Sequence, residues 1–461
     1  MRAWAAVVVL AVASCGGDDG PNRLTPIDAS TTPDAPELYP VVLELEASVN
    51  RSLDVLFVID DSAGMTDKQN NLAASFPSFI EVLNSGPGGL PDLHLGVATT
   101  DMGVRASDGT FGSTVGACDG NGKAGNLTTS GASVTGAFVS DVAQTDGSRA
   151  RNYAGTLEAV FSQMAKVGAS GCGFEQPLAA MKAALDNHPA NAGFLRPDAT
   201  LAVVFVADED DCSASASTLF TTDSAPLGPL GSFRCTQFGV TCTVGGNTAD
   251  EMAVEGTKAA CRSSTTSTVI DRIEPYAEFL RELKPDPKRI IVASLAGPAS
   301  PLTVELVTPT GGGSVQPALM PSCRYTGATG QEQTSPAVRL DEFARLFQSR
   351  GRSLSICKQD LAAELASIAS LLSSAAGSPC IATPLFDMHP TIPGTQPDCI
   401  VEDVVGSATT EIRACGASLT PPCWHLVEEP TCSAGEHLAL RIERSAAPAP
   451  STVTRLRCRL P

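Results

Sequence analysis

The chain has 461 residues, of which 43% are hydrophobic and 18% charged, and its formal net charge is −19 at pH 7. The length suffices for two or three domains. The acidic balance argues against nucleic-acid binding, because phosphate recognition needs a basic surface. Fifteen cysteines indicate an oxidising compartment, and their odd number predicts one cysteine outside the disulfides. No internal stretch reaches the ~20 apolar residues of a spanning helix, which excludes a polytopic membrane protein.

The first residues predict a secretion signal. Met1-Arg2 precedes an apolar run over 3–13, which is too short to span a bilayer but suits a signal-peptide core. The run ends in Val-Ala-Ser-Cys at 12–15, which resembles the lipobox of bacterial lipoproteins. The resemblance implies a signal peptide over 1–14, lipidation of Cys15 and a lipid anchor in the bacterial cell envelope, with the outer membrane favoured. The alternative is an ordinary signal peptide with an incidental cysteine.

Residues 15–46 are rich in Pro, Asp and Thr and predict a flexible tether. Strand and helix patterns then alternate up to about residue 376, with loop-rich insertions near 103–148 and 212–266. Apolar runs predict strands over 53–60, 94–99, 201–207, 289–295 and 354–357, and a hairpin that begins at 302–307. Helical spacing predicts helices over 72–83, 157–169, 177–185, 269–283, 340–347 and 361–372. The alternation favours an α/β fold with an open, doubly wound and mostly parallel sheet.

The composition changes after residue 376. Residues 377–461 contain six cysteines, many prolines and short alternating segments over 400–405, 437–442 and 453–458. This pattern predicts a small β module stapled by disulfides.

Acidic residues follow the two most apolar strands, at Asp60-Asp61-Ser62-Ala63-Gly64 and at Asp208-Glu209-Asp210-Asp211. In a doubly wound sheet, ligands bind outside the carboxyl ends of the strands, so both loops should lie at one edge. Together the segments DVLFVIDDSAGM and VVFVADEDD resemble the metal-ion-dependent adhesion site of von Willebrand factor A (vWA) domains. The resemblance covers residues 47–376. The chain as a whole resembles secreted vWA lipoproteins of the myxobacterial type.

The vWA resemblance implies a cation held by Asp60, Ser62 and Asp208. Mg²⁺ is the first choice, with Mn²⁺ or Ca²⁺ as alternatives, because carboxylate and hydroxyl oxygens are hard ligands. An acidic side chain of an unknown protein partner would complete the shell. Two positions depart from the family pattern: Gly64 stands where the family has a second Ser ligand, and Cys172 stands near the place of a middle-loop Thr. Glu175 is the nearest oxygen donor and could substitute.

Structural alternatives remain open for these residues. Asp60 and Ser62 could cap the following helix, and the run Asp208–Asp211 could be a solvated loop. Three functions follow: a partner-binding protein with a degenerate metal site, which is favoured; a metal-free envelope scaffold; and a metal-assisted hydrolase. The hydrolase is disfavoured because the sequence offers no nucleophile or general base beyond the ligands themselves.

The cysteine count is consistent with the domain boundaries. If Cys15 carries lipid, eight cysteines fall in the vWA region and six in the C-terminal module, and both numbers are even. Loop proximity suggests the pairs Cys118–Cys172, Cys235–Cys242 and Cys323–Cys357.

Overall fold

The computed structural model describes most of the chain from residue 39 onward. The described residues are 39–46, 51–85, 89–144, 146–225, 227–309, 312–328, 330–375, 381, 383–391, 396–416, 421–428, 438–444, 448 and 452–461. The predicted signal peptide, Cys15 and most of the predicted tether lie outside them. Among the described residues, no helix combines the length and apolar character needed to cross a membrane.

The main body is built on a seven-stranded sheet in the order β14-β9-β6-β2-β3-β4-β5. Its strands are β2 (Ser52–Ile59), β3 (Asp92–Thr99), β4 (Val139–Ala143), β5 (Arg149–Arg151), β6 (Thr200–Val206), β9 (Ile290–Ala296) and β14 (Gly351–Ser355). The first five strands in this order are parallel, and β4 and β5 form an antiparallel edge. The α/β prediction is confirmed. The prediction that 103–148 is only a loop-rich insertion is wrong at β4, which joins the sheet.

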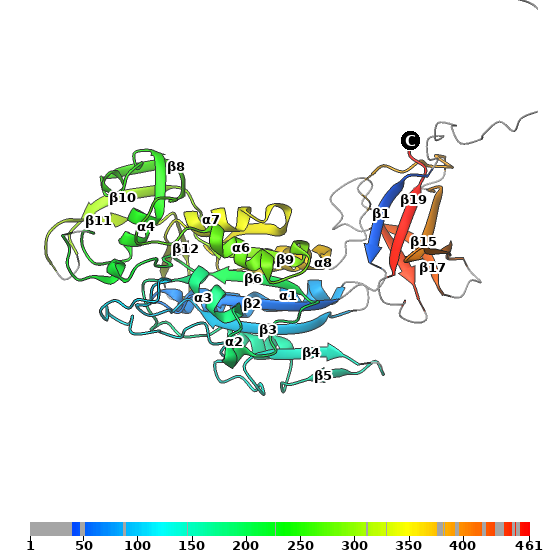
Figure 1. The fold of residues 1–461 in the computed structure, drawn as a ribbon, viewed down its shortest axis with the longest axis horizontal. Helices are drawn as coiled ribbons and strands as arrows, with labels where there is room; N and C mark the ends of the chain where they lie inside the picture. The colour runs from blue at the N-terminus through cyan, green and yellow to red at the C-terminus, as the bar shows by residue number, and fades with distance from the viewer. Residues whose placement is uncertain are drawn as a thin grey trace, which may run out of the picture.

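Helices pack on both faces of this sheet (Figure 1). One face is covered by α1 (Met65–Ser85), α2 (Leu157–Met164) and α8 (Ala362–Ala375), and the other by α3 (Pro177–Leu185), α6 (Glu274–Glu282) and α7 (Val338–Arg345). Successive side chains of β2 enter the two cores alternately, so Phe57 lies on the first face and Val58 on the second. Burial on both faces explains why the central strands are continuously apolar.

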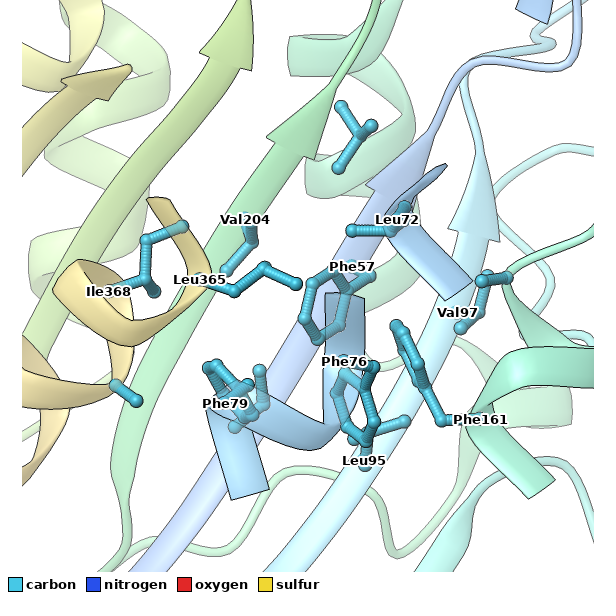
Figure 2. Packing of buried hydrophobic residues seen from close by; sticks show 14 of the residues in the cluster. Phe57, Leu72, Phe76, Phe79, Leu95, Val97, Phe161, Val204, Leu365 and Ile368 are labelled. Carbon is cyan, nitrogen blue, oxygen red and sulfur yellow. The ribbon is translucent and has the colours of Figure 1, made fainter. Parts of the chain in front are cut away.

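Aromatic side chains dominate the first core. Phe57 of β2 contacts Phe76 and Phe79 of α1 and Phe161 of α2, with ring centroids 6.3, 6.0 and 4.7 Å apart respectively (Figure 2). Phe76 stacks on Phe161 with 3.7 Å between the centroids. This packing fixes α1, and with it the loop that joins β2 to α1.

Residues 212–263 and 302–335 add smaller elements beyond the main sheet. A four-stranded sheet has the order β11-β10-β8-β7, with β7 (Val240–Val244), β8 (Gly256–Ser263), β10 (Leu302–Val307) and β11 (Gln316–Leu319). The short helices α4 (Phe233–Gly239) and α5 (Ala249–Met252) adjoin it. A separate hairpin pairs β12 (Cys323–Thr326) with β13 (Gln331–Thr334). The hairpin predicted at 302–307 is confirmed as the antiparallel pair of β10 and β11.

The cysteine-rich C-terminal region is a β module, as predicted. Its sheet has the order β1-β19-β15-β16-β17-β18, with β1 (Val41–Glu46), β15 (Cys399–Val405), β16 (Ala408–Ala414), β17 (Cys423–Glu428), β18 (Leu438–Glu443) and β19 (Val453–Cys458). The predicted tether ran to residue 46, and this limit is wrong. Residues 41–46 pair antiparallel with β19, because Val42 and Leu43 supply apolar contacts to the module core.

Disulfides connect the loops of the main body. Cys118–Cys172 and Cys323–Cys357 form as expected. The predicted pair Cys235–Cys242 is wrong: the structure has Cys212–Cys235 and Cys242–Cys261. Antiparallel pairing of β7 with β8 places Cys242 opposite Cys261, which sequence distance could not reveal. In the module, Cys399–Cys458 and Cys415–Cys423 are formed, while Cys380 and Cys432 lie outside the described residues.

Candidate cation site at the carboxyl ends of the strands

Asp60 and Asp208 follow two neighbouring parallel strands. Because β2 and β6 are paired in register, the loops after both strands leave the same edge of the sheet. The Asp60 amide donates a hydrogen bond to the Val206 carbonyl at 2.8 Å, which continues the pairing for one more residue. Asp60 is fully buried and Asp208 is 8% exposed. The expectation that both loops meet at one edge is confirmed.

The Asp60 carboxyl group lies beside the side chains of Ser62 and Asp208, and its two oxygens differ in their contacts. Its Oδ1 accepts a hydrogen bond from the Ser62 amide at 2.7 Å, while Oδ2 is buried without a hydrogen-bond partner. Burial raises the pKa of Asp60 well above its usual value, and the negative charge of Asp208 raises it further. A buried, unpaired carboxylate oxygen is costly unless a proton or a cation compensates it.

Glu175 approaches the two aspartates from the segment just before α3. It is 2% exposed, and its Oε2 is also buried without a hydrogen-bond partner. Burial raises the pKa of Glu175, as do the negative charges of Glu209 and Asp60. Burial also raises the pKa of Glu209 to about 7, with Asp208 as the second cause. We refer to Asp60, Glu175, Asp208 and Glu209 as the acidic cluster.

The two departures from the family pattern have structural causes. Gly64 has φ +109°, and a Cβ placed there would lie 3.0 Å from Asp208 Oδ2, so a serine would be strained at this position. Cys172 is fully buried in its disulfide with Cys118 and supplies no ligand. Ser62 is buried beside Asp60, and its side-chain hydrogen bond to that carboxyl group opposes the rise in the pKa of Asp60.

Sequence reasoning missed Thr100. Its amide donates to the Ile59 carbonyl at 3.3 Å, and its carbonyl accepts from the Gln176 amide at 3.0 Å. Thr100 therefore lies between the residue before Asp60 and the residue after Glu175, and its Oγ1 is buried without a partner. The available signal was its position directly after the apolar stretch 93–98, at the same sheet edge as Asp60.

Lys68 was also missed, although it contacts the site directly. Its ammonium group lies 3.2 Å from Asp208 Oδ2 and 3.1 Å from Glu332 Oε2, and it donates to the Gly64 carbonyl at 3.0 Å. The side chain is 1% exposed. Lys68 lies in the first turn of α1, where side chains lean toward the helix N-terminus and so toward the β2–α1 loop. Its place in the first helical turn was the signal in the sequence, but its partners Asp208 and Glu332 are distant along the chain.

The rest of the acidic run after β6 has a structural role. Asp210 accepts hydrogen bonds from the amides of Arg339 and Leu340 and so caps α7, while burial raises its pKa to about 6. Asp211 accepts from the Leu178 amide at 3.1 Å in the first turn of α3. The solvated-loop alternative therefore does not hold for these two buried residues.

Asp61 belongs to a neighbouring contact. Its carboxylate pairs with Lys123, which lies in the glycine-rich loop 120–125. A cavity of about 290 Å³ adjoins Lys123 and is lined by Thr99, Lys123, Asn126, Leu127, Thr128 and Val167. Lys123 thus pairs with Asp61, which is separate from the acidic cluster.

The donor set fits a hard cation that retains water ligands. Asp60, Glu175 and Asp208 do not bring three ligand oxygens within 4.8 Å of one another, so a cation would use some of them through water, as Mg²⁺ commonly does. In the module, three possible ligand atoms do lie within 4.8 Å of one another, those of Cys415, His425 and Glu443. The Cys415 sulfur, however, is closed in a disulfide with Cys423 and is not a thiolate.

Comparisons with known proteins leave the family of the chain open. It matches no protein-family model, and no curated protein resembles it at a significant level. Among solved structures it matches the pilus adhesin SpaC from Lactobacillus rhamnosus GG, with 7% sequence identity and a TM-score of 0.28. The match covers 88% of this chain and 39% of the adhesin, so the chain spans about two fifths of that protein's length. A likeness this weak carries no argument about function.

Proposed function

We propose that this protein is a lipid-anchored, extracytoplasmic binding protein of the bacterial cell envelope, which holds a protein partner through a divalent cation at the acidic cluster. In this proposal residues 47–376 form a vWA domain, and Asp60, Ser62, Asp208 and Glu175 hold the cation. An acidic side chain of the partner completes the coordination shell. The signal peptide and the lipid anchor at Cys15 belong to the same proposal.

One observation carries the proposal: two buried carboxylate oxygens, Asp60 Oδ2 and Glu175 Oε2, have no hydrogen-bond partner in a site rich in carboxylates. The ammonium of Lys68 pairs with Asp208 and Glu332. Burial and the charges of neighbouring carboxylates raise the pKa values of Asp60, Glu175 and Glu209. Negative charge is therefore in excess, and a bound dication would compensate it. The mostly parallel sheet, with acidic loops at its carboxyl ends, supports the vWA assignment.

Thermal unfolding of the purified protein with and without Mg²⁺ or Mn²⁺ tests this function. A cation that binds only the folded state at 100 times its Kd stabilises it by about 2.7 kcal/mol, so Tm should rise by several degrees. Asp60→Asn should remove the rise. Asp186→Asn, an exposed change of the same kind directly after α3, should preserve it. An unchanged Tm in the native protein at millimolar cation would contradict the metal-dependent function.

One observation favours a second candidate, the metal-free envelope scaffold. The ion pair between Lys68 and Asp208 already supplies one positive charge to the site. Under this alternative the disulfides and the lysine stabilise the loops, and neither Mg²⁺ nor Mn²⁺ changes Tm. The same unfolding experiment therefore separates the two candidates.

A further inference from the structure

Lys68 places a buried positive charge beside the predicted cation ligands. Its ammonium lies between two carboxylates, 3.2 Å from Asp208 Oδ2 and 3.1 Å from Glu332 Oε2. A buried ammonium requires such compensation, because its desolvation is costly. A divalent ion that binds Asp208 would therefore compete with the Lys68 ammonium for the same carboxylate.

Glu332 gives Lys68 a second partner that does not depend on Asp208. It lies on β13, in a hairpin seated on the first turn of α1. The Tyr325 hydroxyl and the Ala328 amide donate to the two Asp67 oxygens at 2.9 and 3.1 Å. The Cys323–Cys357 disulfide attaches the hairpin to the segment after β14. Glu332 is thus held in place from several sides.

The segment that follows β13 contacts the loop after β6, which carries Asp208. The Ser335 amide, next to the last residue of β13, donates to the Asp208 carbonyl at 2.8 Å. A Cβ on Gly297 after β9 would lie 1.9 Å from the Ser335 carbonyl oxygen, so this segment packs tightly on the sheet edge. The long, flexible Lys68 side chain is consequently the part of this arrangement that can shift.

We infer that Lys68 is a built-in competitor of the divalent cation, and that Glu332 of the β12–β13 hairpin accepts its ammonium when the cation binds. This inference rests on the proposed function, since it concerns how tightly the same site takes a metal. Like charges a few ångströms apart repel. Removing the ammonium should strengthen cation binding. Removing the Glu332 carboxylate should weaken cation binding, because the Lys68 ammonium would then pair with Asp208 alone.

Titration of the full protein with Mn²⁺ alone tests the inference. Electron paramagnetic resonance measures the free Mn²⁺ at each step. Lys68→Met should bind Mn²⁺ about tenfold tighter than the native chain, and Glu332→Gln about threefold weaker. Lys68→Gln should act in the same direction as Lys68→Met, and circular dichroism checks that each variant folds. Lys182→Met removes an exposed lysine paired with Asp186 and should leave the affinity unchanged.

The outcomes separate the inference from the function on which it rests. If the native chain binds Mn²⁺ and both Lys68 variants bind it no tighter, the inference is overturned and the proposed function stands. If the native chain and the Lys68 variants all fail to bind, the proposed function fails and the inference fails with it. Binding by the Lys68 variants alone would support the inference, because the ammonium would then be what excludes the metal.

Discussion

Arg339 shows how single residues hold the site loops in position. Its guanidinium is fully buried and donates to Asp211 Oδ2 at 2.8 Å, to Ser263 Oγ at 2.9 Å and to the Asp271 carbonyl at 2.8 Å. Asp211 in turn caps α3 next to Glu175. One ion pair therefore connects α7, α3 and the loop that follows Asp208.

Arg339→Met should destabilise the protein by about 3 to 5 kcal/mol, because it leaves Asp211 as a buried, unpaired charge. Urea unfolding measures the loss. Arg345→Met on the same helix removes an exposed pair with Asp341 and should cost about 0.5 kcal/mol or less. Equal losses in the two variants would show that the buried pair has no special role.

At the residue level, the sequence indicated the carboxylates but not their neighbours. Asp60 and Asp208 were predictable because each follows an apolar run that could only be a buried strand. Glu175 was predictable from its place before a helix. Lys68 and Thr100 were not identified, because a lysine in a helical turn and a threonine after a strand are ordinary there. Their relevance depends on which atoms they contact in three dimensions.

At the level of elements, strands of the main sheet were predicted more readily than those of the module. β2 and β6 are buried on both faces and therefore read as unbroken apolar runs. β1 and β16 contain polar residues among the apolar ones, so neither forms an unbroken apolar run. The pairing of β1 with β19 joins residues more than 400 positions apart, which local patterns cannot reveal.

The role of β1 can be tested by substitution within it. Leu43 packs against the module core, whereas Val41 on the same strand is 44% exposed. Leu43→Asp should destabilise the module by about 3 kcal/mol, because a charge would replace an apolar contact. Val41→Asp should cost much less. Hydrogen exchange of the β19 amides measures both, and unaltered protection in Leu43→Asp would mean that β1 does not stabilise the module.

At the level of the whole molecule, the C-terminal module and the candidate site lie toward opposite ends of β2. The chain passes from β1 in the module into the amino end of β2, and the acidic cluster follows the carboxyl end of that strand (Figure 1). Eight residues of strand correspond to about 26 Å. The acidic cluster therefore lies about one strand length from the end of β2 that follows β1 in the chain.

The proposed lipid anchor gives a cellular prediction. Cys15→Ala should move the protein from the membrane fraction to the soluble fraction in a bacterial host that lipidates secreted proteins, because acyl chains contribute about 0.8 kcal/mol per buried methylene to membrane binding. Fractionation followed by immunoblotting measures the change. Retention of the variant in the membrane fraction would contradict anchoring through Cys15.

The central claim is that the acidic cluster binds a divalent cation. Crystals soaked in Mn²⁺ test it most directly, because the anomalous signal of the metal locates it without assumptions about ligands. The account predicts one peak among Asp60, Glu175 and Asp208, with Asp60 Oδ2 and Glu175 Oε2 turned toward it and Lys68 displaced toward Glu332. Well-ordered density at millimolar Mn²⁺ with no peak, and with Lys68 still paired to Asp208, would contradict the account.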